Sequence, residues 1–209
     1  MSPKTLIYCN GEPLKNQVFQ HFKNLYSFFI GADGGTNSLL IHKVLPSVII
    51  GDMDSYQAPA SLQHLVQKNP DQETNDLEKA LNYCLLNKIT DVDITGATGF
   101  RIDHTLKNLS VMVQFENQFE NLRLIDNFGV HWLAREKEVM ETKPGQVISL
   151  SALSGTVAGI STEGLKYSLN NESLKVGKRD GSSNQAIGSQ VVTSHKKGNL
   201  LISLQHPFL

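Results

Sequence analysis

Aspartates follow short apolar segments that end in glycine in this 209-residue chain. Asp33 follows one such segment, Asp52 and Asp54 follow another, and Asp76 closes an acidic turn before a helix. If the segments are parallel strands, their carboxyl ends meet at one edge of a sheet. Carboxylates there repel phosphate groups unless a cation lies between them, and oxygen ligands suit Mg²⁺, which bridges to substrate phosphates. The sequence therefore predicts a magnesium site made by Asp52, Asp54 and Asp76.

Each aspartate alone could equally be an ordinary turn-forming or helix-capping residue. Several of them on one sheet edge favour a ligand site instead. The histidines and cysteines do not show the spacing of zinc ligands. No lysine follows Gly34 and Gly35 in the way that a phosphate-binding Walker A loop requires.

A second candidate loop, Gly-Ala-Thr-Gly-Phe-Arg-Ile-Asp-His at 96–104, follows the apolar segment 92–95. The guanidinium of Arg101 matches phosphate oxygens with two donors. Asp103 caps the next helix or binds a ligand, and both roles stay open. His104 is either a structural residue or a phosphate ligand. Asn108, one turn further on, either faces the same site or lies on the helix surface, and the surface position is the one we expect.

The first 130 or so residues alternate between apolar strands and amphipathic helices, which indicates an α/β domain with a mostly parallel, Rossmann-like sheet. The expected strands are 6–9, 27–30, 48–50, 92–95 and 122–125. A helix at 77–85 shows the spacing of a buried face, with a capping box formed by Asn75 and Glu78. A further helix is expected from about 103 to 115.

After Trp132 the helical period disappears and short segments separated by Gly, Ser, Asn and Pro follow. This pattern predicts an all-β sandwich or small barrel. The expected strands are 139–142, 146–150, 155–161, 174–176, 191–193 and 200–204. We place the domain boundary so that the α/β domain covers 1–136 and the β-sandwich domain covers 137–209.

The charges nearly balance, with 19 Lys and Arg against 20 Asp and Glu, so a chain-wide basic surface for nucleic acid is not expected. The apolar runs are far shorter than the ~20 residues of a membrane helix. The N-terminal segment is too brief for a signal peptide. Cys9 and Cys84 lie inside apolar patterns and are expected as buried, reduced thiols. A cytoplasmic protein bound to neither nucleic acid nor membrane is therefore expected.

The ordered motifs of the chain resemble the thiamine pyrophosphokinase family. They are Asp-Gly-Gly at 33–35, Gly-Asp-Met-Asp-Ser at 51–55, the acidic turn 71–76 with Lys-Ala-Leu at 79–81, and the loop 96–104. Gly-Ile-Ser-Thr-Glu-Gly-Leu-Lys-Tyr at 159–167 and Gly-Ser-Ser-Asn at 181–184 continue the similarity in the second half. The resemblance extends from about residue 10 to residue 204.

The resemblance implies a Mg²⁺-dependent transfer of a pyrophosphoryl group from ATP to the hydroxyl of thiamine, with release of AMP. It also implies a homodimer with active sites at the subunit interface. Asp54 and Asp76 match catalytic acids of the family, and Asp52, Asp54 and Asp76 match its metal ligands. The positions that match its ATP-binding residues are Asp33, Gly34, Gly35, Gln72, Thr98, Gly99, Arg101 and Asp103. Ser183 and Asn184 match the segment that approaches thiamine.

Three residues depart from the usual family pattern: Asn75 stands where Thr is common, Phe100 where Gly is common, and Gln185 where Glu is common. Residues 177–191 contain no aromatic side chain that could stack on thiamine. Two alternatives therefore stay open. One is a diphosphokinase for another hydroxymethyl heterocycle, such as a pterin, and the other is a nucleotide- or thiamine-binding module without turnover.

Overall fold

The structure is a computed structural model that describes residues 2–208, and these divide into two compact units, one up to Asn127 and one from Phe128 onward. The division lies nine residues before the expected boundary at 136/137. The reason is the segment Gly129–Leu133, which pairs with a C-terminal strand and which the sequence patterns did not single out as a strand. Each unit is described by itself.

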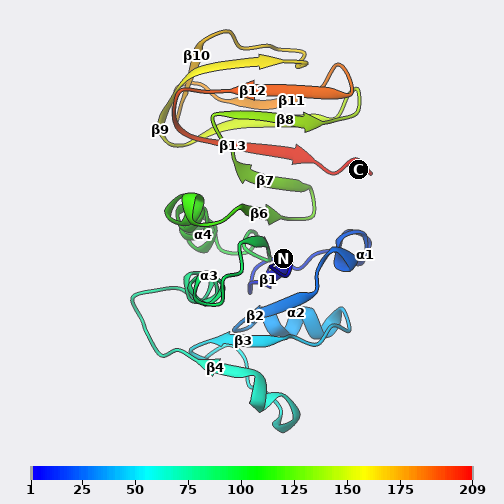
Figure 1. Cartoon of the computed structure of the whole chain (residues 1–209), viewed down its shortest axis with the longest axis vertical. Coiled ribbons are helices and arrows are strands. Elements are labelled where there is room, and N and C mark those ends of the chain that lie inside the picture. The colour runs from blue at the N-terminus through cyan, green and yellow to red at the C-terminus, as the bar shows by residue number, and fades with distance from the viewer. Residues whose placement is uncertain (1, 209) are drawn as a thin grey trace. The chain divides into compact units, whose positions relative to one another are not determined.

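The first unit combines a parallel sheet with helices (Figure 1). Its strands pair in the order β4-β3-β2-β1-β5-β6, and each pairing is parallel. Their bounds are β1 (Thr5–Tyr8), β2 (Phe28–Ala32), β3 (Val48–Gly51), β4 (Val66–Lys68), β5 (Asp91–Thr95) and β6 (Asn121–Ile125). The expected α/β class is therefore confirmed, and the short β4 is an addition to the expected strands.

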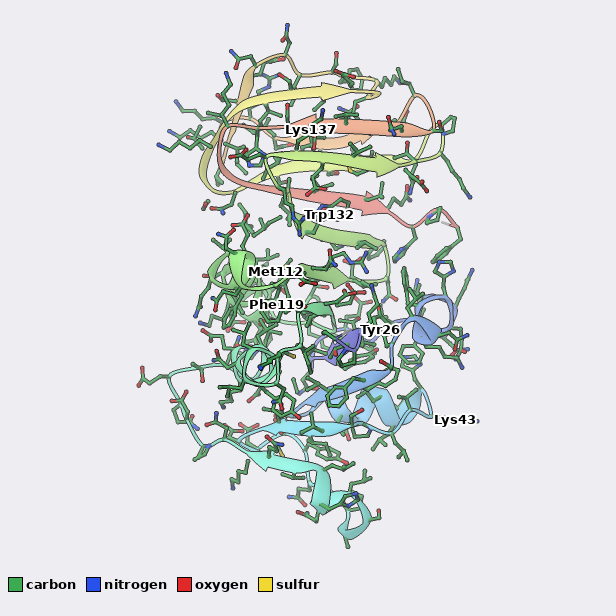
Figure 2. All side chains as sticks on the ribbon, viewed as in Figure 1. Tyr26, Lys43, Met112, Phe119, Trp132 and Lys137 are labelled. Atoms are coloured by element: carbon green, nitrogen blue, oxygen red, sulfur yellow. The ribbon has the colours of Figure 1, made fainter. Side chains whose placement is uncertain are left out.

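The helices are α1 (Asn16–Phe22), α2 (Gly35–Ile41), α3 (Asp76–Leu86) and α4 (Ile102–Phe115), with short 3₁₀ turns at Lys23–Leu25, Ala60–Leu65 and Glu116–Gln118. Helix α3 begins with the predicted capping box: the Asn75 side chain accepts from Glu78 N, and the Glu78 carboxylate accepts from Asn75 N. It buries Leu77, Ala80, Leu81 and Cys84, as its apolar spacing predicts. Figure 2 shows Met112 of α4 inside this unit, whereas Lys43 extends outward.

An ion pair is buried within this unit. The Asp93 side chain is fully buried and accepts two hydrogen bonds of 2.7 Å from the Arg123 guanidinium. The Tyr26 hydroxyl donates a third bond of 2.8 Å to the same carboxylate. Asp93 lies in the middle of an apolar strand, and the apolar pattern alone gave no sign of these partners.

The second unit consists of antiparallel strands (Figure 1). They are β7 (Gly129–Leu133), β8 (Lys137–Glu141), β9 (Val147–Glu163), β10 (Glu172–Lys175), β11 (Gly181–Gln185), β12 (Gln190–Ser194) and β13 (Lys197–Gln205). The order is β7-β13-β9-β12-β8, and β10 and β11 also pair with β9. An all-β second unit is therefore confirmed.

One expectation for this unit is wrong. The segments 146–150 and 155–161 were expected as separate strands, but both belong to β9, which continues through Gly155. Different partners hold its two halves: β11 pairs with residues 147–150, and β10 pairs with residues 156–160. Apolar side chains from these strands, among them Ile148, Leu150 and Ile160, form the core of this unit. Across residues 2–208, no helix has the length and apolarity to cross a membrane.

Candidate active site

The carboxyl ends of the parallel strands meet at a cavity of about 390 Å³ within the first unit. Because β1, β2, β3 and β5 are parallel, the segments that leave them lie at the same edge of the sheet. Helices α3 and α4 supply the remaining walls. The polar lining includes Asn10, Asp33, Asp54, Asn75, Asp76, Thr98, Arg101, His104 and Asn108.

Three carboxylates converge at this edge. Asp33, Asp52 and Asp54 can each offer an oxygen such that all three atoms lie within 4.8 Å of one another. Asp33 is buried; its Oδ2 accepts from Ser55 N at 3.0 Å, while its Oδ1 has no hydrogen-bond partner within the described residues. Burial is the main cause that raises the pKa of Asp33 to about 6, and the neighbouring Asp54 carboxylate adds to the rise. A buried carboxylate oxygen without a donor is the type of ligand that a hard cation completes.

The loop after β3 places Asp52 and Asp54 on the same side. Met53 between them has a φ of +67°, and the Asp54 amide donates to Asp52 Oδ1 at 3.2 Å. The Ser55 hydroxyl donates to Asp54 Oδ1 at 2.7 Å and holds the pKa of Asp54 below its ordinary value. Gln72 does not line the cavity but donates to Asp52 Oδ2 at 3.2 Å, so it fixes one of the three acids.

Asp76 lines the cavity from the first position of α3, although it is not one of the three converging acids. Its Oδ1 lies 3.2 Å from Lys79 Nζ, and the Lys79 side chain is only 3% exposed. Burial raises the pKa of Asp76, and the bond from Lys79 opposes that rise. Lys79 belongs to the sequence motif, but the sequence predicted no role for it. In the structure it is the counter-ion of Asp76.

The loop after β5 brings Thr98, Gly99 and Arg101 to the cavity. Arg101 is paired there with Asp103, through a 3.1 Å bond from Nε and a 2.5 Å bond from the second guanidinium nitrogen. That pairing holds the pKa of Asp103 down, to about 2. Helix α4 lacks a side-chain cap from Asp103, because its N-cap position is Arg101. Of the two roles left open for Asp103, helix capping is therefore excluded.

Gly34 and Gly35 lie outside the cavity lining and are buried. A Cβ on Gly35 would lie 1.9 Å from the Tyr8 carbonyl oxygen, and one on Gly34 would lie 2.4 Å from the Asn10 amide nitrogen. Close packing against the backbone of Tyr8 therefore explains why position 35 needs glycine, whereas at position 34 the nearest atoms belong to the Asn10 side chain, which can shift. A direct contact with ATP stays a prediction for them.

The candidate thiamine residues lie in the second unit. Asn184 is buried and holds the backbone of Tyr167: its Oδ1 accepts from Tyr167 N at 3.0 Å, and its Nδ2 donates to Tyr167 O at 2.7 Å. The Tyr167 ring is 64% exposed. Ser183 is exposed, with a φ of +57°. Tyr167 lies outside residues 177–191, where the sequence contains no aromatic side chain, and the hydrogen bonds of Asn184 connect it to that segment.

Four strained backbone positions lie in these motifs. Asp33, Met53, Phe100 and Ser183 are non-glycine residues with φ between +43° and +67°. Such conformations cost of order 1–3 kcal/mol each and persist where the surrounding structure imposes them, often at functional sites. Lys43, Lys88 and Asn171 also have positive φ and lie outside the motifs, so the strain accompanies the site without marking it alone.

An α/β unit with acids and an arginine at the carboxyl ends of its strands, followed by an all-β unit, fits an enzyme that acts on phosphate-bearing substrates. The sequence model described as "Thiamin pyrophosphokinase, catalytic domain" matches residues 19–125, and "Thiamin pyrophosphokinase, vitamin B1 binding domain" matches residues 135–200. The chain belongs to the thiamin pyrophosphokinase family.

Individual relatives agree with this assignment. Thiamine pyrophosphokinase of Bacillus subtilis is 29% identical over 95% of this chain and 97% of its own length. Thiamin pyrophosphokinase 1 of Caenorhabditis elegans is 27% identical over 95% of this chain and 88% of its own length. The crystal structure of the Bacillus subtilis protein superimposes with a TM-score of 0.85 at 24% identity, covering 97% of this chain and 99% of that one. Thiamin pyrophosphokinase from Candida albicans gives 0.84 at 17% identity, with 98% and 89% covered. At these identities the two structures establish the shared fold.

Proposed function

We propose that this chain transfers the terminal diphosphate of ATP to the hydroxyl of thiamine, giving thiamine diphosphate and AMP. Family membership supports the reaction, and the convergence of Asp33, Asp52 and Asp54 is the observation of the site that carries it. Carboxylates beside a phosphate-binding cavity are unfavourable unless a cation neutralises them. The unpartnered Asp33 Oδ1 fits that requirement.

Asp33, Asp52 and Asp54 would hold Mg²⁺, with Asp76 beside them as the fourth acid. The bound ion would neutralise charge on the ATP phosphates and align them for in-line displacement. Asp33 thereby joins the predicted set of Asp52, Asp54 and Asp76. The three converging acids follow two neighbouring strands, since Asp33 comes directly after β2 and Asp52 and Asp54 come after β3, and the pairing of these strands brings the acids together.

In the transfer, the thiamine hydroxyl oxygen forms a bond to the β-phosphorus of ATP. The bond from that phosphorus to the α,β-bridging oxygen breaks, and AMP leaves with the electron pair. The hydroxyl proton passes to a carboxylate, for which Asp54 and Asp76 are the candidates. Arg101, once released from Asp103, would bind phosphate oxygens, and the backbone around Gly99 would add N–H donors.

The second unit would supply the thiamine site. Ser183 and Asn184 carry the family motif, and Asn184 fixes the backbone of Tyr167, whose side chain is exposed. An exposed aromatic face attracts both a planar ring and a cation, and thiamine contains both in its pyrimidine and thiazolium. The same proposal includes a homodimer, a Rossmann-like fold for the first unit, a sandwich fold for the second, and a cytoplasmic location. The family resemblance supports these expectations.

Release of AMP from Mg-ATP, measured with thiamine and with a hydroxymethyl pterin side by side, tests the proposal. We expect AMP formation that depends on thiamine. Asp54→Asn and Asp76→Asn should each lower kcat by roughly 100-fold or more while the fold persists. Asp91→Asn, at the opposite end of β5, is the control and should keep normal turnover. Faster AMP release with the pterin would favour the other diphosphokinase, and no turnover with ATP binding intact would favour a binding module.

A further inference from the structure

Asn108 is a buried polar residue in the middle of α4, one helical turn after His104. Only 9% of it is exposed, and it lies in the wall of the cavity. The expectation that it would lie on the helix surface is therefore wrong. A buried amide requires partners for both its oxygen and its nitrogen, since leaving either without one costs free energy.

Both ends of the Asn108 amide are bonded to the site. Its Nδ2 donates to the carbonyl oxygen of Ala97, in the loop after β5, at 2.8 Å. Its Oδ1 accepts from Asn75 Nδ2 at 3.1 Å. The Asn75 Oδ1 in turn accepts from Glu78 N at 2.9 Å and caps α3. One continuous chain of hydrogen bonds therefore connects the loop after β5 to the N-terminus of α3.

Each end of this series of hydrogen bonds lies next to a residue that we assign to the reaction. Ala97 is next to Thr98 in the loop that carries Arg101, and Asn75 is next to Asp76. We propose that Asn108 is a positioning residue that fixes the spacing between the phosphate-binding loop and Asp76. This role rests on the proposed function, because it assigns Arg101 and Asp76 to one reaction. A displacement of about 1 Å between such groups can cost up to roughly 100-fold in rate.

The packing of α3 against α4 does not depend on Asn108 alone. Lys107 of α4 forms a 2.9 Å ion pair with the buried Glu78 of α3. Loss of the Asn108 side chain should therefore leave the two helices together and release mainly the loop. This makes the positioning role separable from a role in folding.

Two single variants and their combination test the role. Asn108→Ala removes both bonds of the bridge. Asn75→Ser retains a good N-cap for α3, but its hydroxyl is too short to keep the amide contact with Asn108. Val111→Ala is the matched control, because Val111 is a fully buried residue of the same helix outside the cavity wall. Thermal melting of each variant reports its effect on the fold.

We expect kcat/KM for ATP to fall about 10-fold or more in Asn108→Ala, and several-fold in Asn75→Ser, while KM for thiamine changes less than about twofold. Because both act on one bridge, the double variant should lose little more than Asn108→Ala alone. Val111→Ala should lower the melting temperature and keep both KM values. Three results would overturn the positioning role. They are losses of kcat/KM for ATP that add in the double variant, equal changes in the kinetic constants for ATP and thiamine, and the same ATP defect in Val111→Ala.

Affinity for ATP, measured by calorimetry, separates this role from the proposed function. If the wild-type chain binds ATP but makes no AMP with thiamine, the proposed function fails. The bridge is still tested in that case, since Asn108→Ala and Asn75→Ser should bind ATP more weakly than Val111→Ala does. Equal ATP affinity in all three variants would contradict the positioning role.

Discussion

Replacement of Asp33 by Asn should stabilise the metal-free protein and remove its function. Asp33 is 2% exposed and lies beside two other carboxylates, and burial is the main cause that raises its pKa from 3.8 to about 6. Each pKa unit corresponds to about 1.4 kcal/mol, so the ionised form costs at most about 3 kcal/mol. Solvent in the adjoining cavity screens the charges, and we expect a cost of roughly 1–2 kcal/mol.

The sign of the pH dependence follows from linkage. Below the ordinary pKa of 3.8, Asp33 is mostly protonated in both the folded and the unfolded chain, so Asp33→Asn should have little effect. Between about pH 4 and pH 6 the unfolded chain ionises at Asp33 while the folded chain stays protonated, and the wild type loses stability. Above pH 6 the loss is constant. Asp33→Asn does not lose this stability, because the amide side chain stays neutral and can still accept a hydrogen bond from Ser55 N.

Thermal melting in EDTA from pH 4 to pH 8 measures this difference. A gain of roughly 1–2 kcal/mol corresponds to about 2–8 °C for a chain of this size, and it should emerge between pH 4 and pH 6. Asp71→Asn is the control with the opposite sign. The Thr74 hydroxyl lowers the pKa of Asp71, so loss of the Asp71 charge should destabilise the folded chain at neutral pH. Added Mg²⁺ should stabilise the wild type and leave Asp33→Asn almost unchanged. A pH-independent gain, or a loss at pH 8, would refute the reasoning.

Three further predictions concern other parts of the chain. Tyr167→Ala should raise KM for thiamine about 5–10-fold while Tyr167→Phe keeps it, as initial rates at saturating ATP would show; equal KM values would exclude ring stacking. Arg123→Met leaves the buried Asp93 carboxylate without its main partner and should cost about 3–5 kcal/mol in urea unfolding; a loss under 1 kcal/mol would contradict that. Burial raises the pKa of Cys9 and Cys84 to about 12. Neither should react with a disulfide reagent at pH 8 until the chain unfolds, and rapid reaction of the native protein would show that one is accessible.

Local signals predicted the elements that present the site. The apolar spacing and the capping box fixed α3, with Asn75 at its N-cap, because these interactions lie within a few residues of one another. Strands β1, β2 and β3 were evident from continuous apolar runs, and parallel pairing then implied a common edge for Asp33, Asp52 and Asp54.

Contacts between distant segments could not be predicted in this way. The Asn108–Asn75 bond spans 33 positions, and the bond between Asn184 and Tyr167 spans 17. Neither involves a periodic pattern, and both depend on how the strands and helices are packed. The ion pair between Lys79 and Asp76 is different, because it joins positions three apart on α3 and the helical spacing alone could have indicated it.

The transfer of labelled phosphate from ATP tests the central claim most directly. With ATP labelled at the γ-phosphate, Mg²⁺ and thiamine, we expect label in thiamine diphosphate and an equal amount of unlabelled AMP. Both products should disappear in EDTA and fall roughly 100-fold or more in Asp54→Asn. Formation of labelled thiamine monophosphate with ADP, or release of AMP at the same rate without thiamine or without Mg²⁺, would contradict a metal-dependent diphosphate transfer at this site.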